Sequence, residues 1–175
     1  MEPCNCPQLV RAVAARATSF LQEEVDIDVQ GCEFHLEDVL QLQLGYLTSL
    51  MSVECAQKLY LALSFDEPLI LRAFERYTED LEIDDAERSQ YLEETAADLV
   101  NIIVGNATAA FSDSGAPAIQ LSPPVLITQG KNIFRHKEAQ FFRAMLHTEY
   151  GVLDVFCIGP KRLFDEKLNY IEESA

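Results

Sequence analysis

One stretch constrains the fold more than any other, namely residues 94–111, ETAADLVNIIVGNATAAF. Wound as an α-helix at about 100° per residue, this stretch and the residues just before it sort into two different faces. One face is apolar and has the spacing of a helix that packs against a core. Its members are Leu92, Ala96, Leu99, Ile103, Ala107 and Ala110. We therefore expect a long central helix over about residues 86–111, with one side buried.

The opposite face of this helix is polar but has little side-chain bulk. Four residues fall within roughly 60° of one another on it, namely Glu94, Asp98, Asn101 and Gly105, and two more flank them, Ala97 and Thr108. A carboxylate and a carboxamide one turn apart, followed by glycine, would let another surface approach the helix closely. The alternative is an ordinary solvated helix face with no function.

The acidity of the chain limits its partners. The net charge is −16, so we expect no binding to the phosphate backbone of nucleic acid. No apolar run reaches the ~18 residues of a membrane span, and the N-terminus lacks the basic start and apolar block of a signal peptide. We therefore expect a cytoplasmic protein that does not bind membranes. Its five cysteines are scattered and odd in number, which indicates reduced thiols.

The remaining sequence predicts helices around two groups of strands. The expected helices are residues 8–24, about 67–77 after the Asp66-Glu67-Pro68 start, 86–111, and 161–174 after Pro160. The expected extended segments are 39–51, 58–64, short pieces within 118–130 broken at Pro123-Pro124, 139–150 and 152–159. Residues 25–38 give no clear assignment.

This order predicts an α+β fold for the whole chain, residues 1–175, as a single domain. The two halves, about 8–80 and 86–174, each consist of a helix, a strand pair and a helix, and we expect them to share a mixed or antiparallel sheet packed with helices. The matching order of elements in the two halves suggests an internal structural repeat.

The central helix and the segment after it resemble the CheC/CheX/FliY phosphatases of bacterial chemotaxis. The family pattern is Asp or Ser, three residues, Glu, two residues, Asn, then 22 residues and Pro; here Glu94, Asp98, Asn101 and Pro124 stand at those separations. The text DLVNIIVGNA and the later SPPVLITQG look like the CheX version. Residues 8–24 have no carboxylate-x-x-Asn pair, which resembles CheX, with one site per chain, more than CheC, with two.

The resemblance implies a protein phosphatase that acts on the phosphoaspartate of a CheY-like response regulator, and a homodimer. Asn101 would orient the attacking water, and Asp98 would dock the regulator's lysine. The other partner-binding residues would be Glu94, Ala97, Gly105 and Thr108, with Pro124 as a structural part of the motif. Mg²⁺ would be held by the regulator, so this chain itself would need no metal site and no cofactor.

Two positions depart from the family pattern. Glu94 replaces Asp or Ser, and Asp98 replaces Glu with a side chain one methylene shorter. The shorter carboxylate keeps open a second reading, a module that binds a receiver domain without hydrolysing it. A third is a structural partner in a motor or receptor complex, as the resemblance to FliY allows.

Overall fold

The computed structural model describes residues 5–36, 39, 41–55, 57–112, 118–128, 132–134 and 139–160. Its elements, in chain order, are α1 (Cys6–Glu24), β1 (Gly31–His35), β2 (Gln41–Gln43), β3 (Leu47–Glu54), β4 (Lys58–Phe65), α2 (Glu67–Tyr77), α3 (Arg88–Ser112), β5 (Gln120–Leu121), β6 (Val125–Thr128), β7 (Asn132–Phe134), β8 (Ala139–Thr148) and β9 (Gly151–Pro160). The three expected helices within these residues are confirmed.

A seven-stranded sheet forms the centre of the molecule, with the order β1-β8-β9-β4-β3-β5 and with β6 also paired to β3. All of its pairings are antiparallel. The β8–β9 hairpin turns at Gly151, whose φ of 118° favours glycine. Helices on an antiparallel sheet confirm the α+β fold class.

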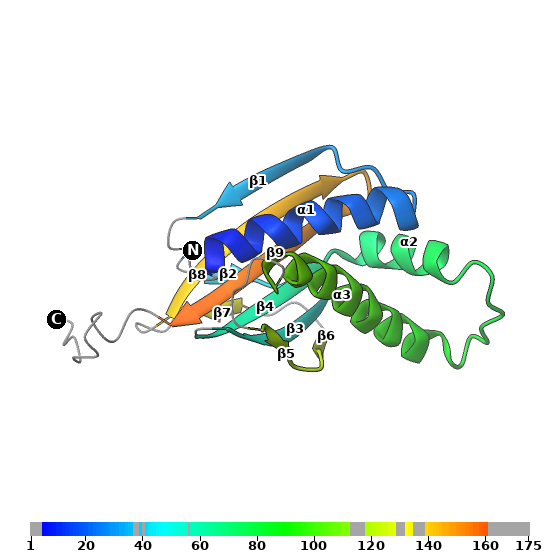
Figure 1. Cartoon of the computed structure of the whole chain (residues 1–175). Helices are drawn as coiled ribbons and strands as arrows, with labels where there is room; N and C mark the ends of the chain where they lie inside the picture. The colour runs from blue at the N-terminus through cyan, green and yellow to red at the C-terminus, as the bar shows by residue number, and fades with distance from the viewer. Residues whose placement is uncertain are drawn as a thin grey trace, which may run out of the picture.

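Helices α1 and α3 lie side by side over one face of the sheet, and α2 lies near one end of them (Figure 1). The main core fills the space between these helices and the sheet. Along α1 the predicted apolar face is fully buried, at Leu9, Val13, Ala17 and Leu21. Asn5 caps this helix by accepting a hydrogen bond from the Gln8 amide at 3.0 Å.

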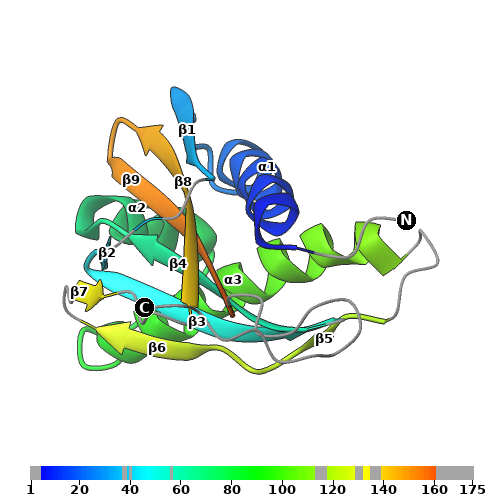
Figure 2. The same cartoon turned by 90° about the vertical axis from the view of Figure 1, so that its left-hand side faces the viewer.

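A second, smaller core lies on the other face of the sheet. There β2 and β7 form a two-stranded ribbon away from the helices (Figure 2). The buried members of this cluster are Leu42, Leu44, Ala62, Phe141 and Phe156. Both faces of the central strands are therefore covered.

The prediction of a single strand over residues 39–51 is wrong, because this segment forms two strands, β2 and β3. Gly45 lies at the break, and its amide donates to Ser64 Oγ at 2.6 Å. A Cβ on Gly45 would stand 2.6 Å from the Phe65 carbonyl oxygen, so the chain passes too close to β4 for any larger residue. The second of these strands, β3, also continues to Glu54, beyond the expected end at residue 51.

The structure differs from the predictions, or extends them, at three further places. Residues 31–35, which the sequence left unassigned, form the edge strand β1, with all five residues exposed. Ala110 is exposed, because the buried stripe of α3 ends at Ala107 and the last turn lies beyond it. The helix expected over 161–174 lies outside the described residues, and β9 includes Pro160. The internal repeat therefore stays a prediction.

Candidate active site on the central helix

The two faces predicted for α3 exist in the structure. Its core-facing stripe is buried and consists of Thr95, Ala96, Leu99, Val100, Ile103, Val104 and Ala107, with Leu92 half-buried beside it. Glu94, Asp98 and Asn101 are exposed on the other side of the helix. Burial of the apolar stripe orients the helix, and this orientation presents the three polar side chains to solvent.

The three polar residues differ in their contacts. Glu94 accepts a hydrogen bond at 2.8 Å from Gln90, one turn earlier on the same helix. Among the described residues, the side chains of Asp98 and Asn101 have no hydrogen bond and no ion pair. An unengaged carboxylate and an unengaged carboxamide one turn apart can both bind a partner without first breaking an internal contact.

Small residues keep the surface beside them low. A Cβ on Gly105 would meet no atom within 4 Å, so the space above this glycine is open. Ala97 and Gly105 are half-buried: Ala97 flanks the polar group, and Gly105 follows it one turn after Asn101. Another protein could therefore approach the α3 backbone closely here.

Thr108 does not lie on this surface. It is 4% exposed, and its hydroxyl donates to the Val104 carbonyl at 2.8 Å. Helical spacing places Thr108 near the polar face, but neighbouring structure covers it. The prediction that Thr108 is exposed on the polar face of α3 is therefore wrong.

Pro124 lies in the connection between β5 and β6 and is half-buried. The residue two before it, Ser122, fixes this connection to β3: its amide donates to the Ser52 carbonyl at 3.1 Å, and its Oγ accepts from the Ser52 amide at 2.9 Å. Helix α3 packs against both β3 and β6. The proline thus belongs to the sheet that supports the helix.

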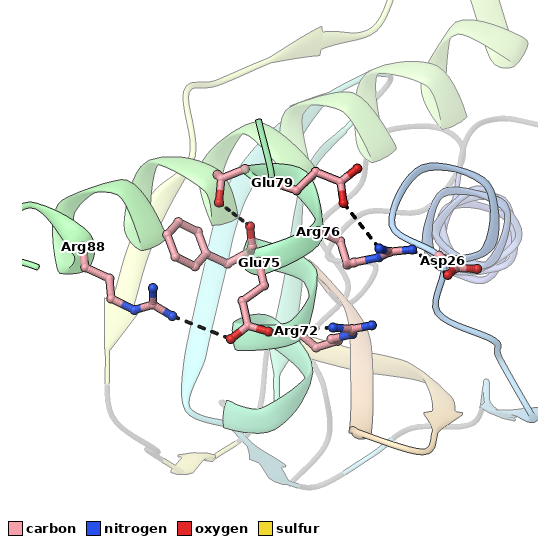
Figure 3. A network of polar contacts seen from close by, with 8 residues as sticks. Asp26, Arg72, Glu75, Arg76, Glu79 and Arg88 are labelled. Atoms are coloured by element: carbon pink, nitrogen blue, oxygen red, sulfur yellow. Dashed lines mark hydrogen bonds and ion pairs between the residues drawn. The ribbon is translucent and has the colours of Figure 1, made fainter. Parts of the chain in front are cut away.

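A chain of charged contacts holds the beginning of α3 to its neighbours (Figure 3). Arg88, at the start of α3, lies 3.8 Å from Glu75 of α2, and its guanidinium lies over the Phe74 ring, 5.1 Å from the ring centroid. Arg76 of α2 pairs with Asp26, after α1, at 2.6 Å. Exposed pairs of this kind contribute little singly, but together they connect the three helices.

Two hollows near these elements have no signal in the sequence. One, of about 290 Å³, lies between the start of α3 and the sheet and is lined by Tyr46, Leu47, Ser89, Leu92, Glu93 and Thr128. The other, of about 260 Å³, lies by the β8–β9 hairpin and includes Asp66, Arg143 and Asp154. Both combine residues far apart in the chain, so no local pattern could have revealed them.

Comparison with solved structures decides the fold. Over 86% of this chain and 97% of the other, CheX from Desulfovibrio desulfuricans superposes with a TM-score of 0.72 at 16% identity. A CheC-like superfamily protein from Shewanella gives 0.66 at 15% identity, over 86% of this chain and 96% of that one. A chain of the CheX–CheY–BeF₃–Mg²⁺ complex from Borrelia burgdorferi gives 0.64 at 15%, over 88% and 98%.

This chain has a CheX-like fold. No protein-family model matches its sequence, and no curated protein matches it either. The predicted resemblance is therefore confirmed at the level of the fold, across most of the chain.

Within the CheX-like fold, the described residues offer no ready metal site. No group of three or more His, Cys, Asp or Glu side chains in this part of the chain is arranged to hold an ion. None of the described helices has both the length and the apolar run that a membrane span requires.

Proposed function

We propose that this chain is a phosphatase for the phosphoaspartate of a CheY-like response regulator, with its active site on the exposed face of α3. The observation that carries the proposal is the pair of unengaged side chains, Asp98 and Asn101, on an exposed helix face of a CheX-like fold. The crystal structure of CheX in complex with CheY, BeF₃ and Mg²⁺ supports the choice of partner.

The proposed reaction is hydrolysis of an acyl phosphate. A water molecule attacks the phosphorus in line with the bond to the aspartate oxygen, that bond breaks, and the products are a carboxylate and inorganic phosphate. The Asn101 carboxamide can accept a hydrogen bond from this water and donate another, so it fixes the water's orientation. Its contribution is positioning, which can account for a large part of a rate acceleration.

Asp98 sets the register of the two proteins in this proposal. Its carboxylate pairs with the active-site lysine of the regulator, and the open surface at Gly105 lets the helix enter the regulator's site. Glu94 and Ala97 belong to the same contact surface. Mg²⁺ belongs to the regulator and remains there throughout.

The experiment is the decay of a phosphorylated receiver domain, followed with a catalytic amount of this protein and without it. Several receiver domains are tested in parallel, because the regulator is not identified. Multiple-turnover acceleration for at least one receiver is the expected result. A protein that binds a beryllofluoride-loaded receiver but never accelerates decay would instead be a binding module, which the shorter side chain of Asp98 favours.

A further inference from the structure

Cys6 and Cys157 contact each other although 151 positions separate them in the chain. Cys6 is the first residue of α1, and Cys157 lies inside β9. Both residues are buried, and the Cys157 thiol donates a hydrogen bond to Cys6 Sγ at 2.7 Å. Ordinary apolar contacts have their optimum at about 3.5–4.0 Å between carbon atoms, so the two sulfurs are closer than core packing requires.

The backbone of β9 makes this approach possible. A Cβ on Gly159 would stand 2.9 Å from Cys6 Sγ and 3.1 Å from Leu59 Cδ2. The Cys6 thiol therefore rests on a strand position that has no side chain, two residues beyond Cys157. A larger residue at position 159 would push α1 away and separate the sulfurs.

We propose that Cys6 and Cys157 are a redox modification site that closes to an intramolecular disulfide and fastens the start of α1 to β9. A disulfide bond measures about 2.05 Å, so the sulfurs need to move together by about 0.7 Å. Because α1 packs against α3, the bond would fix the helix layer that contains the proposed active site. The inference rests on the two thiols and does not depend on the proposed phosphatase activity.

The oxidant in this proposal is a small disulfide such as oxidised glutathione. The thiolate of Cys6 attacks one sulfur of the oxidant, which releases one small thiol and leaves a mixed disulfide on the protein. The thiolate of Cys157 then attacks Cys6 Sγ and releases the second small thiol. One disulfide is reduced and one is formed, and the proton lost from each cysteine ends on a released thiol.

Access to the pair comes from the position of Cys6 in the first turn of α1. Terminal turns of helices open locally at a low free-energy cost compared with global unfolding. Cys157 is fully buried within the sheet, so the first attack is assigned to Cys6 and the second to Cys157.

The test treats the full-length protein with oxidised glutathione, blocks the remaining thiols and digests it with trypsin. The expected product is peptide 1–11 linked to peptide 144–161, recovered from monomeric protein and released by dithiothreitol. Peptide 1–11 contains Cys4 as well as Cys6. The decisive variant is therefore Cys4→Ser, in which peptide 1–11 has Cys6 alone.

The link should persist in Cys4→Ser and disappear in Cys6→Ser. In the unmodified sequence, oxidation should also raise the thermal midpoint, since the new bond closes a loop of about 150 residues in the unfolded chain. The midpoint of Cys6→Ser should not respond to the oxidant.

Two results would overturn the proposal. One is a Cys4→Ser protein whose exposed Cys32 reacts with glutathione while no link between the two peptides forms. The other is a link that requires Cys4. If Cys6→Ser fails to fold, the Cys4→Ser digest still decides between these outcomes.

Discussion

At the scale of single residues, Asn101 can be replaced without disturbing the core, because its side chain is exposed and has no partner among the described residues. Asn101→Ala should lower the rate of receiver dephosphorylation by about a hundredfold or more, since the attacking water loses its orientation. The free energy of unfolding should change by no more than about 0.5 kcal/mol, as alanine favours the helix.

Single-turnover decay of a phosphorylated receiver measures the first effect, and urea unfolding measures the second. A variant that keeps the parental rate would leave Asn101 without a catalytic role, even though the fold is CheX-like.

Asp98 tests the docking part of the proposal. Asp98→Ala should weaken binding to a beryllofluoride-loaded receiver by about tenfold or more, because the regulator's lysine loses its partner. Asp98→Glu should keep both binding and turnover, because the longer side chain reaches the same lysine. Binding is measured by calorimetry and turnover by receiver decay.

The two variants separate the competing functions. If Asp98→Ala binds and turns over like the parent, the carboxylate is ordinary surface. If Asp98→Glu instead gains an activity that the parent lacks, the parent is a binding module.

At the scale of elements, Gly105 tests whether a partner must approach the α3 backbone closely. A Cβ there meets nothing within 4 Å, and alanine is the better helix former, so Gly105→Ala should stabilise the protein by about 0.5–1 kcal/mol. The same methyl group raises the proposed contact surface, so dephosphorylation should become slower.

The matched control is Gly31→Ala in β1, where an added Cβ also meets nothing within 4 Å. It should leave dephosphorylation unchanged. Equal turnover of Gly105→Ala and the parent would show that close approach to the helix backbone is unnecessary.

The β8–β9 hairpin contains a pair of charges whose effect depends on pH. Arg143 Nε donates to Asp154 Oδ1 at 2.8 Å, with the two side chains 26% and 13% exposed. Burial raises the pKa of the Asp154 carboxyl above its ordinary 3.8, and the contact with Arg143 acts in the opposite direction. Arg143→Met should therefore destabilise the protein by about 2 kcal/mol near neutral pH, because it leaves a buried carboxylate unpaired.

The sign of the pH effect follows from the raised pKa. The folded state binds the proton of Asp154 more tightly than the unfolded chain does. Protonation of Asp154 therefore favours the folded state at low pH, and this stabilisation is lost as the pH rises through the folded pKa. The cost of Arg143→Met should accordingly be smaller at pH about 5 than at pH about 8. Urea unfolding at both pH values measures this loss of free energy of unfolding. The control is the double variant Arg143→Met/Asp154→Asn, whose loss should not depend on pH.

At the scale of the whole molecule, the sheet has two outer edges. Strand β1 forms one edge, and β5 and β6 form the other. An unpaired edge is a surface on which a second chain can add its own strands. We expect a symmetric dimer joined through sheet edges, with the polar face of α3 left exposed, and sedimentation at micromolar concentration should show it. A monomer under those conditions would contradict this arrangement.

The sequence by itself determined the three helices of the described residues and the polar face of α3. Helical periodicity and end signals are local, so Pro68 in the first turn of α2 and the apolar stripe of α3 identify these elements without knowledge of their partners. The exposure of Glu94, Asp98 and Asn101 follows from the burial of the opposite side of the same helix. The spacing from Asn101 to Pro124 matches the pattern of the CheC/CheX/FliY family, and this resemblance predicted the fold.

Tertiary structure alone decided what depends on contacts between distant segments. Strand pairing is non-local, so the division of residues 39–51 between two sheets follows from the close approach of Gly45 to β4. Thr108 has the helical spacing of the polar face, and packing against other elements buries it. Cys6 and Cys157 became neighbours only when α1 packed on β9, because sequence spacing contains no information about a contact made across 151 positions.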